Sequence, residues 1–167
     1  MASLDLLFKA WDVAHWEFTL AFEGLSDEDL WKRPHPRLLS VGELAGHLAY
    51  WEAVGVTPAE AGGKVDLAHV SIKSPLVDNA FRYYSSSENS PASLPIGCAE
   101  VLQELKRVHE EAKAEMTKNS PDSADIIPGF KENTYGQVME YRVFHVAYHT
   151  GQAYSVRHLL GHTTTDN

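Results

Sequence analysis

Hydrophobic residues recur at helical spacing in four long stretches of the chain, and no convincing alternation of apolar and polar residues predicts a strand. The first stretch runs from Leu4 to Phe22. One face of it carries Leu4, Leu7, Phe8, Trp11, Ala14, His15, Phe18 and Phe22. Gly24 follows it, as is common after the C-terminus of a helix. The pattern predicts an amphipathic helix at the start of the chain.

The second predicted helix begins at Ser40 and ends near Val54. Ser40 and Glu43 have the spacing of a capping box, in which each side chain bonds the free backbone N–H of the other. His47 lies on the apolar face of this helix, whereas Glu52 is expected to point well away from that face. His47 is therefore predicted to face the core.

A long connection with poor periodicity separates the second helix from the third. It runs from about Gly55 to Pro95 and contains several glycine and proline breakers. About 40 residues are more than two adjacent antiparallel helices need. We therefore expect the connection to cross the bundle, with a short helix near Pro75–Tyr84 that partly covers it.

The third predicted helix extends from about Ala99 to Met116. Its apolar stripe includes His109, and its opposite face is highly charged. Such a charged face is typical of a solvated surface rather than a partner site.

The fourth stretch, from Thr134 to Gly161, predicts the last helix. Thr134 and Gln137 match a second capping box, and Gly161 is a favoured helix stop. The expected inward stripe comprises Val138, Tyr141, His145, Tyr148, His149, Gln152, Val156, Leu159 and Leu160. Four long helical patterns without a strand pattern predict an all-α four-helix bundle, with the long connection between helices two and three.

Length and charge narrow the class of protein. With 167 residues, the chain is expected to form a single domain over residues 1–167. The net charge of −9 should repel nucleic-acid phosphates and anionic lipid surfaces, so neither is an expected partner. We find no signal peptide and no apolar run long enough to span a membrane.

The single cysteine, Cys98, excludes an internal disulfide and a cysteine-rich zinc site. Its position near a helix start could enhance its reactivity, but a buried structural thiol is the simpler interpretation. One unpaired cysteine suits a reducing compartment, and the cytoplasm is the expected location.

Two histidines of the last helix give the clearest chemical signal. His145 and His149 are four residues apart and so share one helix face. Two imidazoles on one face can hold a divalent metal ion, although core histidines satisfied by hydrogen bonds explain the spacing equally well. If the second helix faces the last, His47 completes a set of three nitrogens that leaves coordination positions open for water or substrate.

Two well-known types of metal site do not match this sequence. A zincin protease needs the pattern His-Glu-x-x-His, and Val146 occupies the position of the glutamate here. A ferritin-like di-iron site needs paired Glu-x-x-His segments with further carboxylates, and the sequence has no such pair.

The segments His47-Leu-Ala-Tyr-Trp-Glu, His145-Val-Ala-Tyr-His149-Thr-Gly-Gln152 and Leu159-Leu-Gly161 resemble the DinB/YfiT-like superfamily. Helix order and the long second connection extend the resemblance over nearly the whole chain. The resemblance implies an up-down-down-up bundle, commonly a homodimer, in which His47, His145 and His149 bind a divalent metal such as nickel or zinc. Some similar proteins are thiol-dependent transferases, and others are proposed hydrolases.

The expected function is that of a metal-dependent enzyme that activates a thiol or water for transfer to, or hydrolysis of, a small molecule. Three neutral ligands leave the full charge of the metal available to acidify a bound thiol or water. No catalytic base is assigned. A non-catalytic bundle that binds a metal or a small ligand is the alternative, and a structural or dimerisation bundle without metal is a third.

Five further residues are candidates for the surroundings of the site. Gln152 lies one turn beyond His149 and could orient water or substrate, or only pack. Tyr148 and Trp51 could shape a pocket, although aromatic residues at helical spacing usually belong to the core. His15 and His109 could line the site or support its ligands, and ordinary core positions are the alternative for both.

Overall fold

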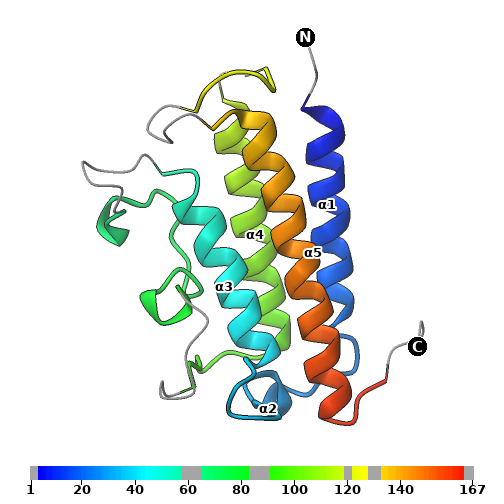
Figure 1. Cartoon of the computed structure of the whole chain (residues 1–167). Helices are drawn as coiled ribbons and strands as arrows, with labels where there is room; N and C mark the ends of the chain where they lie inside the picture. Colours follow the sequence, from blue (N-terminus) through cyan, green and yellow to red (C-terminus); the bar gives the residue numbers. More distant parts are fainter. Residues whose placement is uncertain (1–3, 58–64, 83–90, 119–121, 128–132, 164–167) are drawn as a thin grey trace.

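The structure is a computed structural model that describes residues 4–57, 65–82, 91–118, 122–127 and 133–163. Four long helices dominate these residues: α1 (Asp5–Leu20), α3 (Val41–Val54), α4 (Cys98–Thr117) and α5 (Tyr135–Leu159). They lie side by side in Figure 1, with α1 against α5 and α3 against both α4 and α5. The described residues contain no strand, and the predicted all-α class is confirmed.

Two of the long helices run one way and two the other (Figure 1). At the C-terminal ends of α1 and α5, the Arg157 guanidinium donates to the Leu20 carbonyl (3.1 Å), so these two helices are parallel. The short helix α2 (Asp27–Leu30) follows α1, and its Asp27 carboxylate accepts from the backbone N–H of Cys98 at the start of α4 (2.7 Å). Consequently α4 starts where α1 ends.

The sequence signals for helix ends are present in the structure. Ser40 with Glu43 caps α3, and Thr134 with Gln137 caps α5, each as a complete capping box. Gly161 follows α5 with a φ of 91°, a left-handed conformation that glycine adopts without the steric cost of a Cβ. The bounds predicted for all four long helices lie within two residues of the observed ones.

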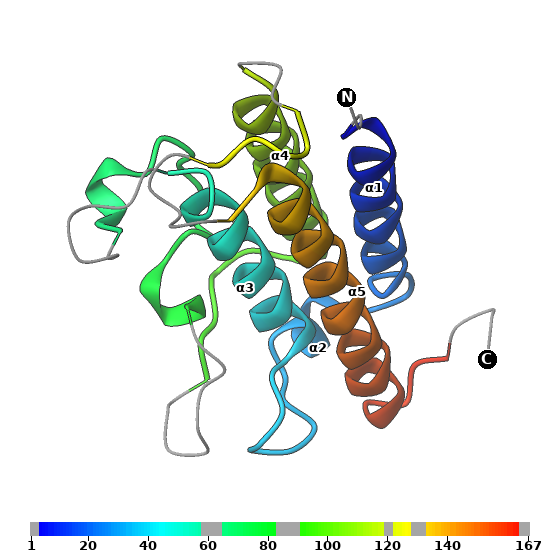
Figure 2. The same cartoon turned by 45° about the horizontal axis from the view of Figure 1, so that its top comes forward.

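The connection between α3 and α4 contains two 3₁₀ turns, η1 (Leu67–His69) and η2 (Asn79–Phe81). The short helix expected near Pro75–Tyr84 is wrong within the described residues, where only η2 forms; residues 83 and 84 lie outside them. The Asp78 side chain caps the start of η2 by accepting from the backbone N–H of Ala80 (2.8 Å). This hydrogen bond supports a single turn. Figure 2 shows the described parts of the connection beside α3, on the side away from α1.

Close packing brings η2 onto α3. A Cβ added to Gly46 would lie 2.5 Å from the Phe81 ring, so only glycine allows the ring to approach this closely. Phe81 is 3% exposed and belongs to the core. The contact also places the Phe81 carbonyl beside His47, one residue after Gly46, where it takes part in the site described below.

The expected inward stripe of α5 is partly wrong. Tyr141, Tyr148 and Leu159 are 62%, 52% and 64% exposed. The buried residues of α5 are Gly136, Met139, Arg142, Val146, His149, Thr150, Ala153, Val156 and Arg157. Because α5 packs against both α1 and α3, it buries a wide arc that includes polar side chains, and apolar periodicity alone places that arc incorrectly.

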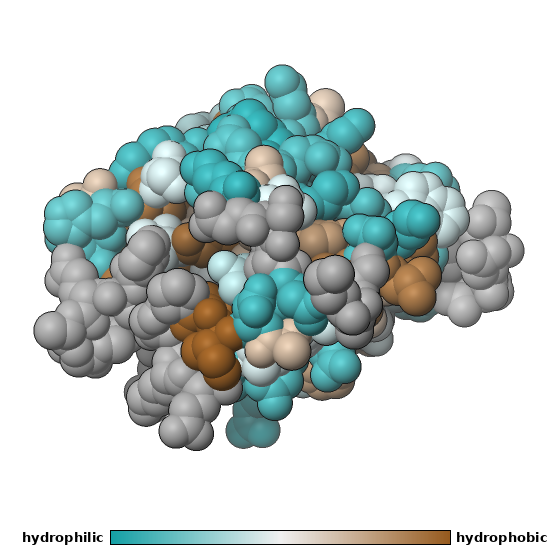
Figure 3. All heavy atoms as spheres, turned by 90° about the horizontal axis from the view of Figure 1, so that it is seen from above, coloured by the Kyte–Doolittle hydropathy of each residue, from teal (hydrophilic) through white to brown (hydrophobic). Residues whose placement is uncertain are grey.

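One end of the bundle is mainly polar. Seen from the end at which α1 and α5 begin, hydrophilic residues cover much of the described part of this face, with apolar areas between them (Figure 3). No helix among the described residues has the length and apolar character needed to cross a membrane.

Candidate metal centre

Three histidines from two antiparallel helices meet between α3 and α5. His47 on α3 and His145 and His149 on α5 offer ligand nitrogens that all lie within 4.8 Å of one another. His145 Nε2 lies 3.3 Å from His47 Nε2. His47 and His149 are buried and His145 is partly buried, so the group lies at the edge of the core. These three side chains could hold a metal ion.

Hydrogen bonds fix the orientation of two of these rings. His47 Nδ1–H donates to the Phe81 carbonyl oxygen (2.9 Å), and His149 Nδ1–H donates to Gln152 Oε1 (2.6 Å). Each bond places the ring proton on Nδ1 and leaves the Nε2 lone pair unprotonated. Partners of this kind set the tautomer and ring angle of metal-binding histidines.

The environment favours the neutral form of all three imidazoles. Burial, together with the proximity of His149 and His47, lowers the pKa of His145 to about 3. Burial and the proximity of His47 lower the pKa of His149 to about 4, against the opposing bond from Gln152. Burial also lowers the pKa of His47. Because a metal ion binds only deprotonated imidazole, these shifts suit a metal site.

The donor set fits a borderline divalent metal. Imidazole nitrogens suit zinc, nickel and copper, whereas magnesium and calcium prefer oxygen ligands. No carboxylate belongs to this group of three, so a bound dication would keep its full charge. Three protein ligands also leave at least one position of a tetrahedral site open.

A cavity of about 740 Å³ opens beside the triad, with His47 and His145 in its wall. Its apolar lining includes Trp51, Val54 and Val138. Its ionisable lining, apart from the two histidines, comprises Glu52, Arg82, Tyr50, Tyr141 and Arg142. This size and mixed lining are typical of sites for small molecules.

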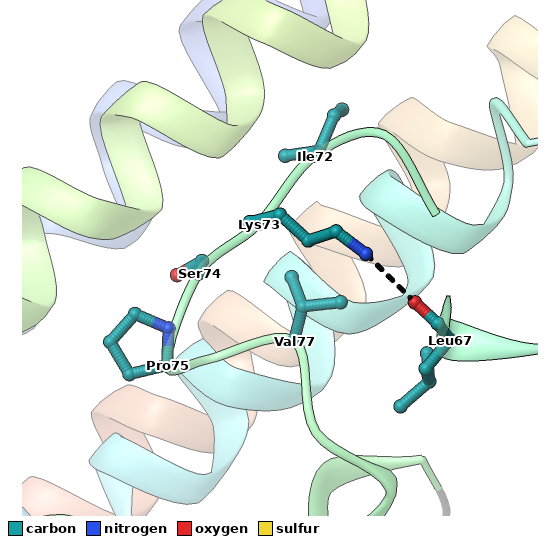
Figure 4. Close-up of a pocket in the computed structure, with 6 residues that line it drawn as sticks. All are labelled: Leu67, Ile72, Lys73, Ser74, Pro75 and Val77. Atoms are coloured by element: carbon teal, nitrogen blue, oxygen red, sulfur yellow. Dashed lines mark hydrogen bonds between the residues drawn. The ribbon is translucent and has the colours of Figure 1, made fainter. Parts of the chain in front are cut away.

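A second hollow lies between η1 and η2 and has about half that volume, about 350 Å³ (Figure 4). Among the described residues that line it, the ionisable one is Lys73, whose ammonium donates to the carbonyls of Leu67 and Ala68 (both 3.1 Å). The lysine thus holds the loop together, and the hollow offers no cluster of reactive groups.

Glu52 lies where the sequence did not predict it. Instead of pointing away from the apolar face, it is 2% exposed, and its Oε1 accepts from Trp11 Nε1 (3.0 Å) and contacts His15 Nε2. His109 Nδ1 lies 3.7 Å from Oε2 of the same carboxylate. All but one of the residues of α3 are buried, so this helix has no solvent face on which a charged residue could lie.

His15 and His109 therefore form a separate buried cluster with Glu52. Their rings stack at 3.8 Å between centroids, and the ligand atoms of the three residues lie within 4.8 Å of one another. Neither histidine is among the residues that line the cavity; of the three residues of the cluster, Glu52 also lines it. The sequence signal for this cluster was that His15 and His109 face inward from separate helices, because a buried carboxylate can bond both.

The remaining predicted pocket residues lie in different surroundings. Trp51 lines the cavity, and its Nε1 donates to the Arg82 carbonyl (2.8 Å). Gln152 is not among the residues that line the cavity, and its Oε1 accepts from His149 Nδ1–H. Tyr148 packs edge-on against His149, 5.1 Å between centroids, but is exposed and not part of the lining.

Replacing Gln152 with leucine is expected to weaken zinc binding by about 10–100-fold, because His149 loses the acceptor that fixes its tautomer. Gln152→Glu keeps an acceptor and should retain wild-type affinity or exceed it. Competition with a chromophoric chelator measures both constants. Gln103→Leu, at an exposed position of α4, is the control. Equal zinc affinity in Gln152→Leu and wild type would show that this bond does not support the site.

Comparison with known proteins places the chain in a family. The family model of the DinB superfamily matches residues 10–153, a range that contains all three histidines of the triad and Gln152. Comparisons with curated proteins and with solved structures found no significant match. Since the matched range covers most of its residues, the chain belongs to the DinB superfamily.

Proposed function

We propose that the chain is a metal-dependent enzyme that activates a thiol or a water molecule for transfer to, or hydrolysis of, a small molecule. The observation that carries this proposal is the convergence of His47, His145 and His149, all favoured in the neutral form, beside a cavity that is large enough for a small substrate and has His47 and His145 in its wall. A closed structural site would instead use all four positions of a tetrahedral metal.

Nickel or zinc is the proposed metal, because both accept imidazole ligands and the triad contains no oxygen donor. When bound, such an ion would supply Lewis-acid chemistry that lowers the pKa of a thiol or water. A reducing compartment such as the cytoplasm, which the single cysteine suits, would supply small thiols.

Several residues of the protein have distinct roles in this proposal. The Phe81 carbonyl and Gln152 orient two of the imidazoles, and Trp51 with its apolar neighbours keeps water away from one side of the cavity. Glu52 is the carboxylate of the lining. Although burial alone would raise its pKa, the attraction of His15 and His109 holds the pKa far below its ordinary value, which makes Glu52 a weak general base.

The test is turnover with defined metal content. Protein purified without a histidine tag would be depleted of metal, reloaded with zinc or nickel, and assayed with small thiols and an electrophile, and separately with ester and amide substrates. The proposal expects turnover that follows metal content and that is lost in His149→Ala. Stoichiometric metal binding without turnover in any assay would favour the second function, a non-catalytic metal or ligand-binding bundle, which the weak basicity of Glu52 already supports.

We also propose a homodimer formed through α5. Tyr141, Phe144 and Tyr148 are each more than half exposed and lie in a row, with centroids 6.1 and 5.9 Å apart. Contiguous exposed aromatic side chains mark interaction surfaces more often than scattered ones do. The row lies on the same helix as two histidines of the triad, so a second copy there would border the site.

Phe144→Glu is expected to shift the protein from dimer to monomer, because a charge in the middle of an apolar interface must be buried without a partner. Sedimentation velocity over a range of protein concentrations measures the change. Gln103→Glu adds the same charge at an exposed position of α4 and should leave the dimer intact. A monomeric wild type would contradict the proposed dimer.

A further inference from the structure

The buried guanidinium of Arg142 has no hydrogen-bond partner among the residues that the structure describes. It lies on α5, is 7% exposed and lines the cavity. Its contacts among the described residues are a stack over the Trp11 ring, at 5.1 Å, and electrostatic interactions with Glu52 and His145. Its Nε is fully buried and unbonded. Because guanidinium carries five donors and stays charged, burial in this state is costly.

Other buried arginines of the chain are paired. Arg157 donates to the backbone carbonyls of Leu20, Glu23 and Thr163, which close the ends of two helices. Arg33 forms a two-pronged ion pair with Glu43 at the start of α3. Arg142 differs from both because its side chain reaches the cavity rather than a backbone or carboxylate acceptor.

Glu52 does not neutralise Arg142. The carboxylate already bonds Trp11 and His15 through Oε1, and its Oε2 faces His109. Burial lowers the pKa of Arg142, and the attraction of Glu52 offsets only part of that cost. The two charges share a cavity wall without forming an ion pair.

The charges around the cavity favour an anion. The lining contains one carboxylate, Glu52, and that carboxylate already contacts Trp11, His15 and His109. The charge of Arg142 therefore has no hydrogen-bonded counter-ion among the described residues, and a dication bound at the triad would add to the positive charge. Arg142 precedes His145 by three residues, about one helical turn, so an anion bound by Arg142 would lie next to the triad.

We propose that Arg142 binds a carboxylate of the substrate and thereby positions the substrate beside the histidine triad. The planar fork of guanidinium matches a carboxylate with two parallel hydrogen bonds. Trp51, Val54 and Val138 would contact the apolar part of the same molecule, so the ligand is an amphiphilic carboxylate. The proposal rests on the function proposed above for the site, but carboxylate binding needs neither metal nor turnover.

Paired probes test the proposal in metal-free protein, where a carboxylate cannot bind a metal instead. 3-Phenylpropionate and its uncharged amide differ only in the group that Arg142 would bind, and quenching of tryptophan fluorescence measures both affinities. Wild type is expected to bind the carboxylate at least 10-fold more tightly than the amide, and Arg142→Met should lose that preference. Arg107→Met on α4, outside the cavity, should keep it.

Thermal unfolding separates a binding role from a structural one. Arg142→Met keeps a side chain of similar length and removes an unpaired buried charge, so its unfolding temperature should equal or exceed that of wild type. Arg142→Lys keeps the charge without the fork and should retain part of the carboxylate preference.

Equal affinity of wild type for both probes, or an unchanged preference in either variant, would overturn the proposal. His149→Ala should keep the preference while losing metal-dependent turnover, so the two proposals fail separately.

Discussion

Replacing His149 with alanine is expected to abolish stoichiometric zinc or nickel binding. The remaining pair, His47 and His145, would offer two nitrogens where a stable site needs at least three protein ligands. The loss should exceed the 10–100-fold that removal of an orienting partner such as Gln152 costs. Elemental analysis after purification without a histidine tag, followed by chelator competition, measures occupancy and affinity.

A matched control variant is available on the same helix. His158→Ala removes an exposed imidazole of α5, nine residues beyond His149, and should leave metal content unchanged. His47→Ala and His145→Ala should each reproduce the loss seen in His149→Ala, because the site takes ligands from both helices. Full occupancy in any one of the three variants would remove that histidine from the ligand set.

Replacing Glu52 with leucine is expected to lower the free energy of unfolding by about 3–5 kcal/mol, the usual cost of removing one partner from a buried charged group. The change would leave Trp11 Nε1 and His15 buried without their shared acceptor. Glu52→Gln keeps an acceptor and should cost less. Urea denaturation of metal-free protein measures both, with Glu110→Leu on the exposed face of α4 as the control, expected to change stability by about 0.5 kcal/mol or less.

The contribution of the Glu52 charge should also depend on pH. Its pKa in the folded protein is far below its ordinary value, so the unfolded chain takes up the proton first as pH falls. The stabilisation is therefore complete above the unfolded pKa of about 4.3 and is lost progressively at lower pH. The difference in stability between wild type and Glu52→Gln should be larger at about pH 5 than at about pH 3. A difference that grows on acidification would contradict the assigned charge state.

Helix ends and helix number could be predicted because they depend on local chemistry. The capping boxes at Ser40 and Thr134 and the glycine after α5 act within a few residues, so the sequence shows them directly. The pairing of His47 with His145 and His149 followed from helical spacing once the second and last helices were placed face to face. The DinB resemblance pointed to the same three residues.

Glu52 and Arg142 could not be predicted in the same way. The apolar stripe of α3 places Glu52 away from the core, and the sequence did not single out Arg142, yet α3 is buried almost all round and α5 packs against two helices. What decides their burial is the number of neighbours that a helix acquires in the bundle. The hydrogen-bond acceptor of His47 could not be predicted either, because it is the backbone carbonyl of Phe81 in the connection between α3 and α4. Phe81 can approach α3 this closely because residue 46 is a glycine.

A crystal structure of the zinc-loaded protein, with anomalous scattering at the zinc edge, tests the central claim most directly. A zinc ion is expected at about 2.0–2.1 Å from Nε2 of His47, His145 and His149, with at least one remaining coordination position open toward the cavity lined by Trp51 and Arg142. Zinc bound instead within the cluster of His15, Glu52 and His109, or no zinc peak at the triad, would contradict it.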